Sequence, residues 1–575
     1  MEVKKENVDE IIKQYESVKQ YKTSMGFIKN WAESIDFVED RQWIKTKKNE
    51  NMPKPQHNII KLARRTKTSA ISSDTIKIIF SPLEQVEDNG LSLEASKMFN
   101  DAIIETNEDI DQEELDSEVV ENAFDLGTGI SFYAWNNDFH GGYKTKFIGN
   151  IEGVCVDPVD AFPGNPQCRN KDKQPFWILH FREMVDTIKK EAKGNEIPEE
   201  QIALIVADKD TATDSYEASK YEVTGEDKTS VWIKLWRDID DKKIYFQKAT
   251  KSCLFKPKTA MWDYDGETAE PYPLAVLNWE TRKKSIFGIG EVEGMIFNQK
   301  SINFISAMQL MNVQDTGWSK YIVKYDALKS PMQNVPGEIV NDESNQPGEN
   351  IKPMTPAQMS NQGFQVLDNM ITNTRIFNGI SESVTGESMG ANMSAAAIIA
   401  LQGQAKAPLD GNRKKVIRYH KQVARIKEMF FKTKFDLPRV IGTKNEDGTQ
   451  GSTEFTGTKY KDIPLKLKID VGISSSYSES LAVATLDKFL DKGYITPLQY
   501  ADLAPKNVMP FAEQFKKMKE LEKVDQLKQA EQALQKQADT IKMLQQQVLD
   551  HKNALQRFNE PAMPKERPQQ NQGGM

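Results

Sequence analysis

The stretch that decides the fold of this chain is YPLAVLNWETRKKSIFGIGEVEGMIFNQKSINFISAMQLMNV, residues 272–313. A basic turn broken by Gly288 and Gly290 leads into a predicted long helix that carries apolar residues on two sides, with Phe297, Phe304, Met308 and Met311 on one side and Met295, Ile302 and Ile305 on the other. A helix of this kind must be covered on both sides to be stable in water. Its carboxylates, Glu291 and Glu293, lie where negative charge stabilises a helix N-terminus. The sequence therefore indicates a structural strut rather than a reactive site.

Composition places the chain among large globular proteins. Its 575 residues are 38% hydrophobic and 28% charged, which is enough to bury a sizeable core in two to four domains or one elongated subunit. The formal net charge of −8 repels phosphate, so a contact with nucleic acid must come from local basic patches. The N-terminus has no apolar signal region, and no stretch reaches the length needed to span a bilayer. We therefore expect a protein of the cytosol, or one assembled there.

The order of patterns along the chain predicts an α+β fold. Helical spacing dominates residues 7–50 and 92–127, and Pro53 and Pro55 separate the first of these regions from the next helix. Short alternating strands dominate residues 145–280, interrupted by a helical insertion near 183–206. After the long helix, the sequence predicts further elements in this order: a turn-rich segment at 314–359, a second helix at 361–380, a Ser-, Gly- and Met-rich loop at 381–393, a basic helix near 413–435, and a strand at 464–476.

The C-terminal region carries the most regular repeat. Apolar residues recur every seven positions at Leu527, Leu534, Ile541, Val548 and Leu555, with Ala530, Leu544 and Phe558 at the matching d positions. Gln537 and His551 interrupt the d positions. This pattern predicts a coiled-coil seam of about four heptads, followed by a tail, 559–575, whose composition is typical of disorder.

Motifs for catalysis or cofactor binding are weak throughout. There is no P-loop, and the glycines of FGIGEVEG have the spacing of a turn at a helix start rather than of a dinucleotide fingerprint. The three cysteines and five histidines have no zinc-binding spacing, and the carboxylates of Asp157 and Asp160 are interpreted as turn residues. We therefore predict no enzyme activity, no catalytic residue, no cofactor and no metal. A carboxylate cluster assembled from distant residues remains open at the level of sequence.

Basic residues gather on the predicted helix near 413–435, in NRKKVIRYHKQVARIKEMFFKTKF. The simpler interpretation is a solvated outer face, and the alternative is a face that contacts phosphate or bridges subunits. Residues in the 381–393 loop offer no readout of base edges. If that loop meets DNA, the contact is expected to be weak and independent of sequence.

Several segments in the same order resemble the portal proteins of tailed double-stranded DNA bacteriophages, the head-to-tail connector family. The segments that carry this resemblance are Trp31 to Trp43 followed by KPQHNII, then LGTGISFYAW, VDPVDAFPGN, FGIGEVEGMIFNQKSINF, ANMSAAAIIALQGQ and KIDVGISSSYSESLAVATLDKFLDKGYIT. No single one is diagnostic, but together they cover most of the chain. The resemblance implies an elongated, mostly helical α+β portal fold with parts called wing, stem, clip and crown.

In family terms, the resemblance divides the chain as follows: wing 1–285, first stem helix 286–315, clip 316–360, second stem helix 361–380, tunnel loop 381–395, long helix and wing strand 396–480, crown and C-terminal helical extension 481–558, and disordered tail 559–575. It also implies a ring, usually of twelve subunits, at one capsid vertex of the virion, assembled in the host cytoplasm. The coiled-coil-like extension is longer than a minimal crown and is where the chain departs most from the family pattern.

The resemblance further implies partners and a route for DNA. The genome would be packaged through the ring by a terminase large subunit and later ejected, and the ring would contact major capsid, scaffold, and head-completion (adaptor) or tail proteins, with no membrane. Candidate DNA-facing tunnel residues are Lys300, Met389, Asn392 and Met393. Two other interpretations stay open: a coiled-coil scaffold protein, favoured by the C-terminal heptads, and a DNA-processing packaging enzyme.

Overall fold

The computed structural model describes residues 5–43, 52–72, 76–83, 90–142, 146–208, 227–264, 270–317, 320–323, 351–354, 361–380, 407–444, 450–471, 476–504 and 512–558. The chain divides into two compact units, Met1–Ser474 and Ser475–Met575. Helices and strands are mixed in the first unit, while the described elements of the second are helical. The predicted α+β class is therefore confirmed for the described residues.

The first half of unit 1 alternates between helices and strands. Its helices are α1 (Lys5–Ser24), α2 (Phe27–Val38), α3 (Ile59–Ser72), α4 (Leu91–Asp109), α5 (Gln112–Leu126), α6 (Val185–Gly194) and α7 (Glu199–Ile202). The break between α1 and α2 lies at Gly26, whose φ of 75° is accessible to glycine at little cost. The predicted separation by Pro53 and Pro55 is confirmed, because the chain between α2 and α3 is not helical where it is described.

Two antiparallel sheets form the centre of unit 1. A three-stranded sheet has the order β3-β2-β9, and a five-stranded sheet has the order β4-β5-β6-β7-β8. Their strands are β2 (Thr128–Gly141), β3 (Phe147–Val156), β4 (Ala161–Pro163), β5 (Phe176–Met184), β6 (Lys228–Arg237), β7 (Ile244–Ala249), β8 (Leu254–Ala260) and β9 (Leu274–Asn278). The first six residues of β2 are buried, as an apolar strand covered on both faces must be.

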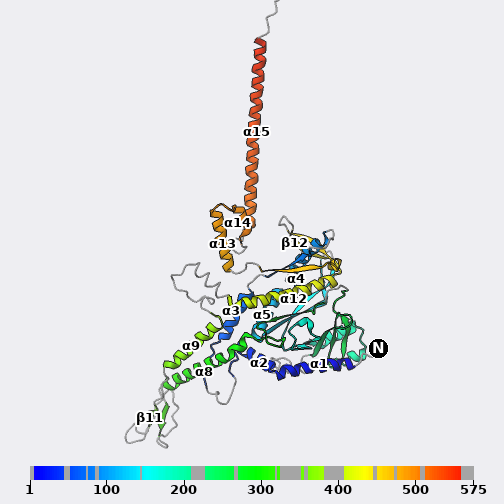
Figure 1. Ribbon diagram of the computed structural model, residues 1–575, viewed down its shortest axis with the longest axis vertical. Coiled ribbons are helices and arrows are strands. Elements are labelled where there is room, and N and C mark those ends of the chain that lie inside the picture. Colours follow the sequence, from blue (N-terminus) through cyan, green and yellow to red (C-terminus); the bar gives the residue numbers. More distant parts are fainter. Residues whose placement is uncertain are drawn as a thin grey trace, which may run out of the picture. The chain divides into compact units, whose positions relative to one another are not determined.

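The remaining elements of unit 1 follow β9. They are α8 (Glu291–Gly317), β10 (Lys320–Val323), β11 (Ile351–Met354), α9 (Asn361–Phe377), α12 (Asp410–Lys434), β12 (Arg439–Lys444), β13 (Gln450–Phe455) and β14 (Leu465–Val471). Three two-stranded ribbons complete the strand pairing: β1 (Ile76–Pro82) with β14, β10 with β11, and β12 with β13. Helices α8 and α9 lie side by side, and the β10–β11 ribbon lies at their far end (Figure 1).

A hydrophobic core joins these elements. Its members include large side chains that are fully buried, such as Trp177, Trp262, Trp279 and Tyr419. A second, smaller cluster lies where α1 meets the five-stranded sheet and contains Ile11, Tyr15 and Trp232. Packing of α12 against β9, β1 and α4 brings the chain after the α8–α9 hairpin back onto the first half.

Unit 2 consists of α13 (Ser476–Asp491), α14 (Pro497–Leu503) and α15 (Ala512–Phe558). Thr496 caps α14 in a capping box with Gln499, and Pro497 occupies the first helical position, which accounts for the start of this helix. The predicted C-terminal helix is confirmed as the 47-residue α15.

Candidate subunit-interaction surfaces

The turn before α8 is built by the close approach of two backbone segments. A Cβ atom added at Gly288 would lie 2.2 Å from the carbonyl oxygen of Gly127, and one added at Gly290 would lie 2.7 Å from that of Asp125. The backbone of the α5–β2 turn therefore fills the space beside both glycines. This arrangement supports the interpretation of FGIG as a turn at a helix start, and the glycines are needed for packing against backbone.

The first turn of α8 is anchored through its carboxylates. Glu291 accepts hydrogen bonds from Lys67 Nζ at 2.7 Å and from Trp279 Nε1 at 2.6 Å. Glu293 pairs with Arg282 at 3.0 Å. These contacts add to the favourable position of negative charge at a helix N-terminus. Both glutamates thus hold the strut in place.

The joint also contains a buried acid. Asp125, at the end of α5, receives two hydrogen bonds from Arg64 Nε at 2.9 and 3.1 Å. Burial raises the pKa of Asp125 to about 7, and the opposing effect of the Arg64 guanidinium is smaller.

The inner face of α8 is covered by the same chain. Met295 and Ile302 are buried, as the sequence predicts for this side. Among them lies a row of buried amides: Gln299 accepts from Ile59 N at 3.1 Å and donates to the His57 carbonyl at 2.7 Å and to Asn303 at 2.9 Å. Asn303 in turn donates to Gln42 at 2.6 Å. Because buried amides must be paired, this network fixes how α8 lies against the N-terminus of α3.

The outer face of α8 is not covered by described residues. Phe297 is 79% exposed, Phe304 52% and Met308 43%. These three residues lie at positions i, i+7 and i+11 of one helix, so they form a continuous stripe, called here the α8 stripe. The sequence predicts that both apolar sides need a cover. Among the residues that the structure describes, only those on the inner side of α8 provide such a cover.

Helix α9 extends this apolar surface. Its exposed hydrophobic residues are Phe364, Val366, Ile376 and Phe377, the last with 84% of its surface accessible. Gln309 near the end of α8 donates to the Gly363 carbonyl near the start of α9 at 3.3 Å, so the two helices run antiparallel. These α9 residues were not predicted from the sequence as a surface, because which side of α9 stays exposed depends on its packing against α8 and α3.

The predicted DNA-facing residues divide into two groups. Lys300 lies on the side of α8 that meets α2, where its ammonium forms an ion pair with Glu33 and lies 5.6 Å from the centre of the Phe37 ring. Met389, Asn392 and Met393 lie outside the described residues, as does the whole predicted tunnel loop, 381–395.

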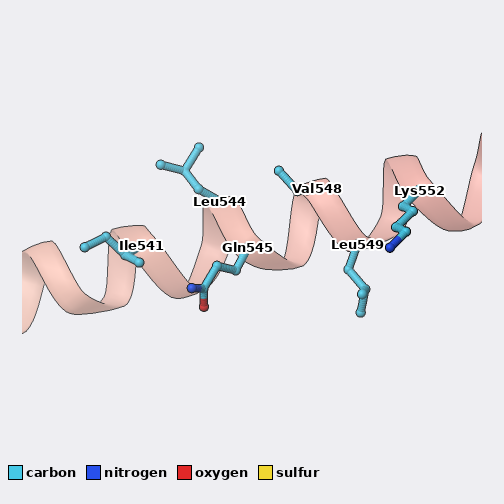
Figure 2. A pocket seen from close by; sticks show the side chains of 6 residues that line it. All are labelled: Ile541, Leu544, Gln545, Val548, Leu549 and Lys552. Atoms are coloured by element: carbon cyan, nitrogen blue, oxygen red, sulfur yellow. The ribbon is translucent and has the colours of Figure 1, made fainter.

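Helix α15 presents a second apolar surface. Leu534, Ile541, Val548 and Leu555 are between 55% and 66% exposed, as is Leu544 at 55%. Figure 2 shows Leu544 and Val548 projecting from one side of the helix, while Leu549 projects from another. The heptad side chains are thus in place on a helix with no described partner along this surface. Met543 and Leu549 add apolar area that the heptad pattern does not include.

Candidate metal ligands and acids have structural partners. Asp160 interacts with His180 Nδ1 at 3.1 Å, and Asp157 accepts from Asn122 at 2.9 Å. Both residues border a turn, in which Asp160 N donates to the Asp157 carbonyl at 2.9 Å, and each carboxylate also contacts a side chain from another element. Within the described ranges, no group of three or more His, Cys, Asp or Glu side chains could hold a metal ion.

Comparison with known proteins places these surfaces in a family. Residues 184–562 match the family described as Phage P22-like portal protein. No curated protein matches the chain significantly. Among the described helices none is long and apolar enough to cross a membrane. The matched region includes the α8–α9 hairpin, α12 and all of α15 and covers well over half of the sequence, and the chain therefore belongs to the phage P22-like portal protein family.

Proposed function

We propose that copies of this chain form a ring at one vertex of a bacteriophage head, through which the genome is packaged and later ejected. A structural role as a portal follows from the family, and we infer the ring of twelve subunits from the same resemblance. The proposal is carried by the α8 stripe. A ring of identical subunits places each strut between two neighbours, so a second copy would cover Phe297, Phe304 and Met308.

The proposed parts follow the family plan. Residues 1–285 would form the wing, together with the region 396–480 that contains α12 and β14. Helices α8 and α9 would be the two stem helices, the segment 316–360 the clip, and 381–395 the tunnel loop. Residues 481–558 would form the crown and its helical extension. In this arrangement the α15 seam would contact the same helix of neighbouring copies, in a barrel.

Double-stranded DNA would pass through the ring without sequence specificity. The net charge of −8 supports a conduit, because many phosphate contacts would hold DNA and stall it. Lys300, Met389, Asn392 and Met393 are the proposed tunnel-facing residues. A terminase large subunit would supply the motor, and capsid, scaffold and head-completion or tail proteins would attach around the ring.

Electron microscopy and native mass spectrometry of the purified chain test the ring. We expect closed rings with a central hole several nanometres across; monomers with nuclease or ATPase activity would contradict the proposal. A variant with Phe297→Ser and Phe304→Ser tests the stripe. Burying a phenylalanine contributes roughly 1.5–3 kcal/mol, so losing two per interface should shift the population toward monomers. Ile239→Ser is the matched control, since Ile239 is 91% exposed and lies outside both stem helices.

The contribution of Lys300 is tested by DNA retention. Lys300→Ala should alter the retention or release of packaged DNA if the ammonium guides phosphates. Glu33→Gln, which removes only the partner carboxylate, separates this effect from loss of the ion pair. Unchanged packaging and release in Lys300→Ala would remove Lys300 from the tunnel.

A coiled-coil scaffold is the second candidate function, and the exposed α15 seam is the observation that favours it. Removing the residues after 512 distinguishes the two. A portal should still form rings without this helix, whereas a scaffold held by the heptads should lose its self-association.

A further inference from the structure

A stripe of four cations runs along α12 on the side away from the core. Lys414, Arg418, Lys421 and Arg425 are exposed, and none of them forms an ion pair with another described residue. They recur at intervals of four, three and four residues, so they lie on one face of the helix. The opposite face contains Tyr419, Val423 and Ile426, which are buried. This set of four residues is called here the α12 basic stripe.

The α12 basic stripe is electrostatically unfavourable in an isolated chain. Cations spaced three and four residues apart on a helix repel each other, and this repulsion destabilises the helix. Burial is the largest cause that lowers the pKa of the neighbouring Lys415; the carboxylate of Glu280 opposes this effect, and the like charge of Arg418 adds to it. A row of cations in this setting is compensated when a complementary row of anions lies opposite to it.

The chain carries such a row of anions. Residues 98–143 contain neither Lys nor Arg, and carboxylates are dense where α4 ends and α5 begins. Among the exposed acids without an ion pair to a described residue are Glu108, Asp111, Glu113, Glu114 and Glu118. This set of five residues is called here the α5 acidic stripe.

The acidic stripe lies beside the β3 end of the three-stranded sheet. Asn122 on α5 donates to Cys155 Sγ on β3 at 3.3 Å and to Asp157, just after β3, at 2.9 Å. Glu118 precedes Asn122 by four residues, so it lies on the same side of α5. Burial chiefly raises the pKa of the Cys155 thiol, to about 12, and the carboxylates of Asp157 and Glu118 add to this effect.

The basic stripe lies at the other end of the same sheet. The Gln422 side chain of α12 accepts from Val276 N at 3.2 Å and donates to Val276 O at 3.1 Å. The hydrogen bonds between β9 and β2 are made by odd-numbered residues of β9, such as Pro273, whose carbonyl accepts from Tyr133 N. The N–H and C=O groups of the even-numbered Val276 therefore point away from β2. Helix α12 therefore covers the outer edge of β9. The sheet order β3-β2-β9 places the two stripes toward opposite edges of the sheet. Helix α12 also contacts α5, because Tyr419 donates to Asp116 at 3.0 Å and His420 Nδ1 lies 3.6 Å from the same carboxylate. Asp116 and Glu118 are two residues apart, about 200° around the helix, so Glu118 lies on the side of α5 that faces away from α12.

We infer that the α12 basic stripe of one copy docks on the α5 acidic stripe of the next copy around the ring. A ring built from identical chains needs a head-to-tail contact between two different surfaces of each subunit. Two complementary stripes at opposite ends of one sheet meet this requirement. The inference rests on the proposed ring and names residues that join its subunits.

Charge reversal tests this contact. One variant carries Lys421→Glu and Arg425→Glu, and a second carries Glu114→Lys and Glu118→Lys. Each variant alone should show no ring species in native mass spectrometry, because its α12 stripe and its α5 stripe then carry charges of the same sign and repel each other. Mixed in equal amounts, the two should recover rings with strictly alternating subunits. A third variant with all four substitutions should form rings by itself.

Controls separate this inference from the proposed function. Lys189→Glu with Lys193→Glu reverses two surface charges at the same spacing on α6 and should leave rings intact. If the unmodified chain forms no ring, the proposed function fails. If it forms rings and each single-stripe variant does so equally, the stripes bind other partners and the inference is overturned. Folded single-stripe variants that neither the mixture nor the fourfold variant rescues also overturn it, with circular dichroism as the check on folding.

Discussion

Replacing Gly288 with alanine should strain the joint between the central sheet and α8. The added Cβ would lie 2.2 Å from the Gly127 carbonyl oxygen and 2.6 Å from that of Glu280. Both atoms belong to the backbone, and both carbonyls already accept hydrogen bonds, from Trp279 N at 3.0 Å and Ile289 N at 2.9 Å. Relief therefore needs a backbone shift of about 1 Å, and overpacking of this kind costs about 1–3 kcal/mol.

Gly294→Ala is the matched control, since Gly294 lies in α8 itself, three residues after the helix begins at Glu291. Nothing lies within 4 Å of a Cβ added there. Alanine is favoured over glycine in a helix by about 1 kcal/mol, so this variant should be slightly more stable. The free energies of unfolding of the two variants should thus differ by about 2–4 kcal/mol, with opposite signs relative to the unmodified chain.

Thermal unfolding and hydrogen exchange measure this difference. For a unit of this size, each kcal/mol shifts the midpoint by only about 1 °C, so local exchange of the amides in the first turns of α8 is the sharper assay. Exchange there should accelerate in Gly288→Ala and slow in Gly294→Ala. Equal protection in the two variants would refute the argument that backbone contact requires Gly288.

Three further predictions concern buried polar groups. Gln299→Leu removes the hydrogen bonds of Gln299 to the Ile59 amide and the His57 carbonyl, which then keep only their bond to each other at 2.9 Å. Losing two hydrogen bonds should lower the free energy of unfolding by about 1–3 kcal/mol in chemical denaturation. Gln365→Leu, on the exposed side of α9, should change it little. Burial lowers the pKa of Lys427 to about 7, so the unfolded chain binds more protons than the folded chain between pH 7 and 10. The free energy of unfolding should therefore rise with pH across that window. Lys427→Met should flatten this pH dependence, and an unchanged pH dependence would contradict the role of Lys427. Lys22 donates to the Pro158 and Val159 carbonyls at 2.8 and 2.7 Å, so Lys22→Met should loosen α1 and speed limited proteolysis near residue 24; an unchanged cleavage rate would show that α1 is held elsewhere.

Periodicity alone predicted much of the architecture. The long helix after FGIG, the returning helix at 361 and the C-terminal helix follow from apolar spacing, and the strands from alternation at 145–280. The start of α8 at Glu291 agrees with the predicted position of Glu291 and Glu293 at the helix N-terminus, and the Gly288–Gly290 segment before it packs as a turn against α5. Sheet order could not be predicted, since it depends on pairings between residues far apart, such as Phe132 with Leu274.

For the candidate surfaces too, periodic features could be predicted from the sequence and non-periodic ones could not. The apolar stripe on α8 and the α15 seam are periodic and therefore visible in the sequence, and so is the density of cations on α12. The roles of individual charged residues are not periodic. Lys427 and Lys432 belong to the same basic helix as Arg425, yet both are buried, because they lie on the side that packs on the core. Which lysines face outward follows only from the packing of α12.

The hydrogen bonds from Gln422 to Val276 have a consequence for how copies can join. An amide side chain here satisfies the peptide groups that an open edge strand would otherwise offer to another strand. At this edge the sheet cannot grow by adding a strand from a second chain. Misassembly into continuous β-structure is thereby disfavoured on that side, and association is left to side chains on a helix surface. Contacts of that kind can be made, broken and corrected while a closed assembly forms.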